Sequence, residues 1–299
     1  MTAWAALGVI CLVAQAWVLG RWLFDGGLLT LSWNAAEDVS TVRRWVFVAG
    51  QCAIVAGVGG CAVWIVRDAL RRGEVTVHAA LFLGYGTAHW LDPVLNWDRG
   101  GFANNHATVH VAGWGPYLPG WHGPDTLPQP LLYATGLFFP LLILWIWAGA
   151  GMVRWLRRRR PRWGRARLAL ALLAPVAVMD AVAESLLIRT GAYSYAGAAP
   201  ELSLFGGHWY QFPIAEMVLS AALFVIPTVL LTGIADTSHR GGGLFQGDTF
   251  RRPGLRVAVR LLSGIGYAHL SLLLWLTSVS LFLTHPTAPL DTPSFLRGH

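Results

Sequence analysis

The stretch RWLRRRRPRWGRAR, residues 154–167, carries eight arginines and lies directly between two long apolar runs. Apolar runs of about 20 residues are long enough to cross a bilayer as α-helices, and basic residues gather in the loops on the cytoplasmic side. The clustering explains the formal charge of +7 through membrane topology and favours no nucleic-acid partner. The sequence therefore predicts a polytopic membrane protein with a basic cytoplasmic loop.

The composition of the whole chain agrees with a membrane protein. Hydrophobic residues make up 55% of the chain and charged residues only 12%, whereas a soluble domain carries about 25% charged residues. We expect one all-α integral membrane domain over residues 1–299, built as a bundle of seven transmembrane helices. The expected spans are about 3–23, 44–67, 75–97, 129–153, 168–189, 209–234 and 257–284.

The distribution of arginine predicts the orientation of these spans. With the 154–167 loop inside, alternation of seven spans places most of the 22 arginines on the inner side. The chain is therefore expected to be N-inside and C-outside. The external loop 98–128 is long and weakly charged, and it is rich in Trp, Gly and Pro. Loops of this length often act as lids, and an interfacial connector is the alternative.

Four carboxylates lie inside the predicted spans, where a charge costs about 3 kcal/mol on insertion scales. Under the predicted topology Asp92, Asp180, Glu184 and Glu216 all fall in the outer half of the membrane. Residues that bear such a cost usually face a bundle interior or a polar cavity. The alternative, open for each acid taken alone, is that it pairs with other buried donors and only specifies packing.

Asp180 and Glu184 are four residues apart, so they share one face of a helix. Two carboxylates this close in a low dielectric cannot easily both be ionised. A neutral acid beside a carboxylate is the arrangement that general acid–base catalysis uses. The pair therefore predicts acid–base chemistry.

The stretch HWLDPVLNW, residues 89–97, places Asp92 and Asn96 four residues apart as well. On an α-helix this spacing puts Asn96 on the same face as Asp92, as its hydrogen-bonding partner. Pro93 removes a backbone N–H and disturbs the preceding turn, which frees carbonyl groups near Asp92. We expect a local break in the helix at this point.

Aromatic and histidine side chains near the acids complete the predicted site. Aromatic rings can wall an apolar pocket and stabilise a cation, and the alternative is an interfacial belt of the kind found in any membrane protein. His269 lies in the middle of the last span, where it is either a core histidine or an active-site donor. The predicted supporting residues are Asn96, His89, Trp90, Trp97, Tyr193, Trp209, Tyr210 and His269.

Signatures of metal and cofactor chemistry are missing from the sequence. His106 and His110 have a spacing that suits a metal on a helix, but no HExxH motif accompanies them. Phosphate-binding, dinucleotide-binding and nucleophile-elbow motifs are absent, as are aspartate-rich motifs that hold magnesium on a diphosphate. We therefore expect no metal and no cofactor, and an apolar small molecule as substrate.

Five short motifs occur together in the chain, and their combination is typical of one family. They are HWLDPVLNW, GWGPYLPGW, MDAVAES, GAYSYAG and GGHWYQFPIAE. Over about residues 80–220 the chain resembles the AveC-type spirocyclase family. The resemblance implies a bacterial cytoplasmic-membrane protein of polyketide tailoring that closes a dihydroxy-ketone into a spiroketal, in some members with a dehydration. At the matching motifs it points to Asp92, Asn96, Glu184 and Glu216.

The expected chemistry fits these acids. Spiroketal closure needs a neutral acid to protonate a departing hydroxyl and a carboxylate to accept a proton and stabilise the oxocarbenium ion. A terpenoid or carotenoid cyclase would use the same kind of buried acid on a different substrate. A proton-coupled transporter or binding protein is the non-enzymatic alternative, and acids in one layer favour a site over a path. Polyketide or terpenoid substrate and membrane lipid are the expected partners, and the sequence indicates no oligomeric state.

Overall fold

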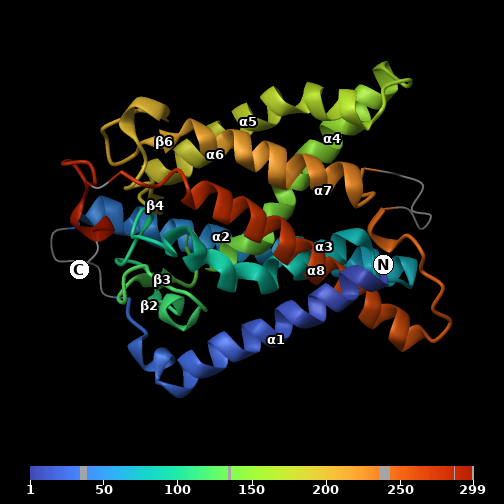
Figure 1. Ribbon diagram of the computed structural model, residues 1–299, viewed down its shortest axis with the longest axis horizontal. Helices are drawn as coiled ribbons and strands as arrows, with labels where there is room; N and C mark the ends of the chain where they lie inside the picture. The colour runs from blue at the N-terminus through green and yellow to red at the C-terminus, as the bar shows by residue number, and fades with distance from the viewer. Residues whose placement is uncertain (34–38, 134–135, 236–242, 286, 298–299) are drawn as a thin grey trace.

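The computed structural model describes the whole chain except residues 34–38, 134–135, 236–242, 286 and 298–299. The described chain is mostly helical, which confirms the predicted all-α class. Most of its helices run roughly along the long axis of the molecule, and α4 crosses this axis obliquely (Figure 1). The principal ones are α1 (Thr2–Phe24), α2 (Thr41–Arg72), α3 (Val77–Thr87), α4 (Ile143–Arg159), α5 (Arg165–Arg189), α6 (Ile214–Leu219), α7 (Ile226–Leu231) and α8 (Pro253–Ser280).

Three short segments of other helix types continue or connect these helices. The 3₁₀-helix η2 (Ala88–Asn96) continues α3, and the 3₁₀-helix η4 (Gly136–Leu142) precedes α4. A π-helical segment, η6 (Ser220–Val225), joins α6 to α7. Segments of π-helix inside an α-helix occur frequently at functional sites.

Six helical segments of the described chain are long and apolar enough to cross a membrane. The predicted span 75–97 is not among them, so the prediction of seven spans is not confirmed. This segment is helical, as α3 followed by η2, but Asp92, Pro93 and Asn96 in η2 lower its apolar content. The six are Thr2–Phe24, Thr41–Arg72, Gly136–Arg159, Arg165–Arg189, Ile214–Leu231 and Pro253–Ser280.

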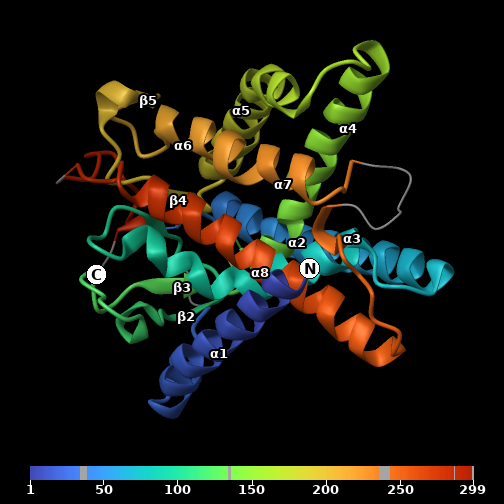
Figure 2. The same ribbon diagram turned by 45° about the vertical axis from the view of Figure 1, so that its right-hand side comes forward.

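The connections separate into two groups at the two ends of the bundle. The turn between α4 and α5, which carries the basic loop, lies at the same end as the N-terminus (Figure 1). The strands gather at the opposite end in both views (Figure 2). This arrangement fits the predicted alternation of the spans, and the side that faces the cytoplasm stays a prediction.

Glycines let α8 approach two neighbouring helices closely. A Cβ atom added to Gly264 would lie 2.2 Å from the carbonyl oxygen of Ala80 on α3. One added to Gly266 would lie 2.1 Å from the carbonyl oxygen of Trp4 on α1. Small residues at such crossings allow the van der Waals packing that drives helix association in membranes. This contact fixes α3, and therefore η2, against α8.

Three two-stranded antiparallel pairs organise the end that carries the strands. β1 (Ala103–Asn104) pairs with β4 (Tyr193–Ser194), and this joins the loop after η2 to the loop after α5. β2 (His110–Ala112) pairs with β3 (Pro128–Pro130), and β5 (Ser203–Leu204) pairs with β6 (Phe212–Pro213). The predicted external loop 98–128 is thus an ordered structure over the end of the bundle, and its role as a lid stays a prediction.

An ion-pair cluster joins segments at the other end. Arg260 of α8 is buried, and its guanidinium lies 2.8 Å from Oε2 of Glu74 and 2.8 Å from Oδ2 of Asp248. Arg256 contacts the same Asp248 oxygen at 2.7 Å. These bonds tie the start of α3 and the segment before α8 to α8 itself.

Candidate functional site

Asp180, Glu184 and Glu216 meet in the interior of the bundle. α5 carries the first two one turn apart, and α6 begins directly after Pro213 with Glu216 in its first turn. One oxygen of each acid lies within 4.8 Å of the other two. Glu216 is fully buried, and Asp180 and Glu184 are 2% and 9% exposed. The structure therefore brings together three of the four predicted acids.

Side chains from other elements donate hydrogen bonds to one oxygen of Asp180 and to one oxygen of Glu184. The indole N–H of Trp145 on α4 donates to Oδ1 of Asp180 at 2.9 Å. The hydroxyl of Tyr195 donates to Oε2 of Glu184 at 2.9 Å. Among the described residues, Oδ2 of Asp180 and both oxygens of Glu216 have no partner at hydrogen-bonding geometry. Asp180 and Glu184 are therefore each held by a donor from another element, whereas Glu216 has no such donor among the described residues.

No positive side chain pairs with these acids in the described part of the chain. Arg189 follows Glu184 on α5, but its guanidinium lies over the rings of Phe205 and Tyr210, at 4.7 Å and 4.2 Å. Three carboxyl groups in one buried space cannot all be ionised without a counter-ion, so the cluster retains a proton or binds a cation. Carboxylate oxygens at this spacing also suit a hard metal ion, and the expected metal-free site stays a prediction.

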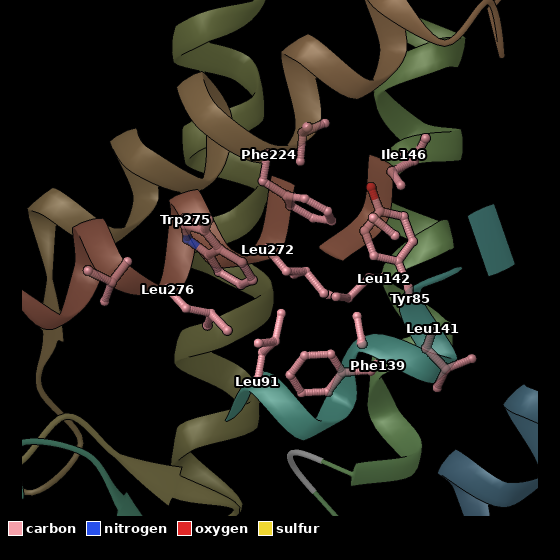
Figure 3. Packing of buried hydrophobic residues seen from close by; sticks show 14 of the residues in the cluster. Tyr85, Leu91, Phe139, Leu141, Leu142, Ile146, Phe224, Leu272, Trp275 and Leu276 are labelled. Atoms are coloured by element: carbon pink, nitrogen blue, oxygen red, sulfur yellow. The ribbon is translucent and has the colours of Figure 1, made fainter. Parts of the chain in front are cut away.

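A small cavity of about 50 Å³ separates Asp92 from Glu184, and both acids line it. The remaining lining is mostly aromatic, and Figure 3 shows Phe139 and Leu142 from η4 opposite Trp275 and Leu276 from α8. A volume of this size holds a few water molecules, whereas ligand pockets measure about 300–1,000 Å³. A substrate must therefore displace part of the lining. The other lining residues are Leu95, Phe102, Phe138, Tyr193, Tyr195 and Val279.

Asp92 reaches the cavity from η2 and is itself held by Gln129 of β3. Nε2 of Gln129 in β3 donates to Oδ2 of Asp92 at 2.7 Å, and both residues are buried. The predicted pairing of Asn96 with Asp92 is wrong. A 3₁₀-helix has three residues per turn, so residues four apart do not share a face, and Asn96 instead bonds to both backbone groups of Phe102. The predicted irregular helix at Pro93 is present as η2.

His269 and Trp90 pair with each other, outside the cavity lining. Nε2 of His269 accepts a 3.0 Å hydrogen bond from the indole of Trp90, and Nδ1 lies 2.9 Å from the carbonyl oxygen of Ile265. This arrangement satisfies both nitrogens of a neutral imidazole and fits a core histidine. His89 contacts the carbonyl oxygen of Gly86 through Nδ1 and packs edge-on against Trp114. The structure brings none of these three to the acids.

Three predicted aromatic residues lie away from the cavity lining as well. Trp97 is 40% exposed. The guanidinium of Arg43 lies 5.5 Å from the ring of Trp209, and the guanidinium of Arg189 lies over the ring of Tyr210. These contacts fit the interfacial alternative better than a pocket wall. Of the predicted aromatic residues, Tyr193 alone is part of the described cavity lining.

Tyr193 and Tyr195 reach the cavity from the loop that follows α5. Burial, and then the charge of the neighbouring Glu184, raise the pKa of both phenols well above the usual value. The hydroxyl groups therefore stay protonated and act as hydrogen-bond donors. An ionised carboxylate can only accept hydrogen bonds, so a hydroxyl that pairs with it must keep its proton.

Many residues of the site did not follow from the sequence, and four of them carry a hydrogen-bonding group: Tyr195, Gln129, Trp145 and Trp275. Tyr195 stands two residues after Tyr193 in GAYSYAG, so the alternation of an extended segment could have indicated it. Gln129 is a single polar residue between two prolines, which is a weak signal. Trp145 and Trp275 lie in apolar stretches of their helices, and nothing in the sequence distinguishes them from packing residues.

The family model described as Spirocyclase AveC-like matches residues 70–241. This range contains Asp92, Gln129 and the three clustered acids. No curated protein and no solved structure matches the chain.

Proposed function

The chain belongs to the AveC-like spirocyclase family, and on this premise we propose that it closes a dihydroxy-ketone polyketide into a spiroketal inside the membrane. The observation that supports this reaction is the placement of Asp92 and Glu184 on one aromatic-lined cavity, with Asp180 and Glu216 clustered beside Glu184. The residues expected to act on the substrate are Asp92 and Glu184, with Asp180 and Glu216 in support.

The proposed reaction removes one molecule of water. The first hydroxyl adds to the ketone and gives a hemiketal, in which its proton ends on the former carbonyl oxygen. Glu184, drawing on the proton shared with Asp180 and Glu216, protonates the hemiketal hydroxyl as it leaves as water. The second hydroxyl attacks the resulting oxocarbenium carbon and gives its proton to Asp92, and return of that proton to Glu184 across the shared cavity completes the cycle. Acid–base assistance of this kind contributes about 10²–10⁴ in rate.

The walls of the cavity suit the cationic intermediate. Tyr193, Tyr195, Phe102 and Trp275 surround the space between the two acids, and the faces of aromatic rings attract a cation. The same walls exclude bulk water, which would otherwise trap the intermediate. Because ring closure also occurs in water, we expect the protein to control which stereoisomer forms through the shape of this pocket.

A cyclase that acts on a terpenoid is the second candidate. The aromatic lining favours it, because such a lining stabilises a carbocation formed on an alkene as well as an oxocarbenium ion. The acid cluster could supply the starting proton in the same way. The family assignment favours the polyketide substrate, and incubation with a linear prenyl alcohol or epoxide tests the terpenoid reaction directly.

We further propose that the protein lies in the bacterial cytoplasmic membrane with its basic loop 154–167 inside and the acids in the outer half. A variant with a single cysteine at Arg162, made after replacement of Cys11, Cys52 and Cys61, tests this orientation. A membrane-impermeant thiol reagent should label it in inverted vesicles and not in intact cells. Labelling in intact cells would reverse the orientation.

The experiment that tests the reaction compares Asp92→Asn with Asp98→Asn in purified protein and a synthetic dihydroxy-ketone. Asp98 lies six residues away and is exposed, with Arg99 as its partner, so its variant controls for the loss of a nearby charge. We expect Asp92→Asn to lose at least about a hundredfold in rate above the uncatalysed closure, and Asp98→Asn to keep the wild-type rate. Full activity of a folded Asp92→Asn protein would refute the assignment.

A further inference from the structure

We propose that Gln129 is a positioning residue that fixes Asp92 as the proton acceptor of ring closure and makes the outer loop part of the site. This inference rests on the proposed cyclase function. It adds a division of roles between the two walls of the cavity, and it names a residue that acts through Asp92 without touching the substrate.

The backbone around Gln129 holds its side chain in one direction. Gln129 lies between Pro128 and Pro130 in β3, and the proline rings restrict the backbone on both sides. The backbone N–H of Leu131 bonds to Val109, and that of Gly113 bonds to Leu127, so β2 pairs with β3 on either side of Gln129. A side chain that is 3% exposed on such a frame has few alternative positions.

The neighbours of the two acids distinguish them. The amide N–H of Gln129 donates to Asp92 at 2.7 Å, and a donor of this kind binds the ionised carboxylate more strongly than the neutral acid. Glu184 also accepts one hydrogen bond, but two further carboxyl groups lie within 4.8 Å of it. Like charges disfavour ionisation there. Asp92 is therefore arranged to accept a proton, and Glu184, across the cavity, to give one.

Gln129 fills the role that the sequence suggested for Asn96. The amide of Asn96 donates to the carbonyl oxygen of Phe102 and accepts from its N–H, so it secures the start of the outer loop. Gln129 secures Asp92 from the end of the same loop. The two amides together tie both ends of the segment from residue 97 to residue 130 to η2, which carries the acid.

A second glutamine offers a matched control. Oε1 of Gln51 on α2 accepts a 3.1 Å hydrogen bond from the backbone N–H of Val109. Gln51 therefore holds the same β2–β3 unit, but from the side of α2. If Gln129 only held the loop in place, removal of either glutamine would have the same effect.

The experiment measures kcat, KM and pH profiles for Gln129→Leu, Gln129→Glu, Gln51→Leu, Asp92→Asn and the double variant Asp92→Asn with Gln129→Leu. Melting temperature and elution profile in detergent report folding of each protein. We expect Gln129→Leu to lower kcat about tenfold or more with KM within about twofold of wild type. Gln51→Leu should keep the wild-type kcat. The double variant should be no slower than Asp92→Asn alone, because both changes act on one group.

Gln129→Glu gives a readout that a structural role would not produce. The new carboxyl group keeps the size of the side chain but places a like charge beside Asp92. The ascending limb of the pH–rate profile should then move to higher pH, and this holds even if Gln129→Leu does not fold. An unchanged pH profile, a wild-type kcat in Gln129→Leu, or full additivity in the double variant would overturn the inference. Undiminished activity of Asp92→Asn would instead overturn the proposed function itself.

Discussion

The hydroxyl of Tyr195 donates a 2.9 Å hydrogen bond to Oε2 of Glu184, which joins the loop after α5 to the acid cluster in the bundle. Tyr195 itself is anchored by its surroundings. Gln211 donates to its backbone carbonyl oxygen at 3.0 Å, and its ring packs edge-on against Phe212. The bond therefore orients Glu184 toward the cavity from a fixed point.

Replacement of Tyr195 by Phe removes this donor and keeps the ring. A hydrogen bond between neutral groups contributes about 0.5–1.5 kcal/mol, so we expect kcat for spiroketal formation to fall about two- to tenfold. Tyr210→Phe is the control, because that ring lies over Arg189 and outside the cavity lining. Equal rates for the two variants would show that Tyr195 does not orient Glu184.

The glycine contact between α3 and α8 should be sensitive to a single methyl group. A Cβ atom at Gly264 would lie 2.2 Å from the carbonyl oxygen of Ala80, so Gly264→Ala forces the helices apart. We expect a loss of stability of about 1–3 kcal/mol, measured as a lower melting temperature in detergent. Gly59→Ala on α2 is the matched control, because a Cβ atom there meets nothing within 4 Å. Equal melting temperatures would contradict the close packing.

We expect Glu216 to lower the stability of the fold and to support the reaction. Its carboxyl group is fully buried and unpartnered among the described residues. Glu216→Gln keeps the volume and removes one ionisable group from the cluster, so we expect an equal or higher melting temperature. The cyclisation rate should fall about a hundredfold. A variant that loses stability and keeps its rate would show that Glu216 is a packing residue.

The ion-pair cluster at the other end should make stability depend on pH. Burial alone would raise the pKa of Asp248, but hydrogen bonds from Arg256 and Arg260 outweigh it and lower the pKa. A carboxylate with a lowered pKa stabilises the fold above its unfolded value of about 3.9, and the contribution disappears as the pH falls through the folded value. We expect Asp248→Asn to melt at a lower temperature than wild type at pH 7. A difference that does not shrink below about pH 4 would contradict this.

The membrane bundle was predictable because its signals are local. Apolar runs and the arginines of 154–167 depend on composition alone, and they indicated the helices that the structure shows. The geometry of η2 was not predictable, because a 3₁₀-helix and an α-helix have similar sequences and differ in residues per turn. Because of that difference, Asn96 does not share a face with Asp92, and Gln129 donates a hydrogen bond to Asp92 instead. The contact with α8 at Gly264 is likewise a tertiary effect.

The acids of the site were predictable and most of their partners were not. A carboxylate such as Asp180 or Glu216 in an apolar run is conspicuous because of its cost. Trp145 is an ordinary residue of a membrane helix, and only the packing of α4 against α5 turns its indole toward Asp180. His269 had two interpretations from the sequence, and the indole of Trp90 supports the structural one.

The rate of spiroketal formation by Glu184→Gln tests the central claim most directly. Glu201→Gln is its control, because Glu201 is exposed in a short helix of the loop after α5. With a synthetic dihydroxy-ketone and protein in detergent, we predict that Glu184→Gln falls to the uncatalysed rate and loses its stereochemical preference. Glu201→Gln should match wild type in both. A folded Glu184→Gln protein with the wild-type rate and preference would contradict the account.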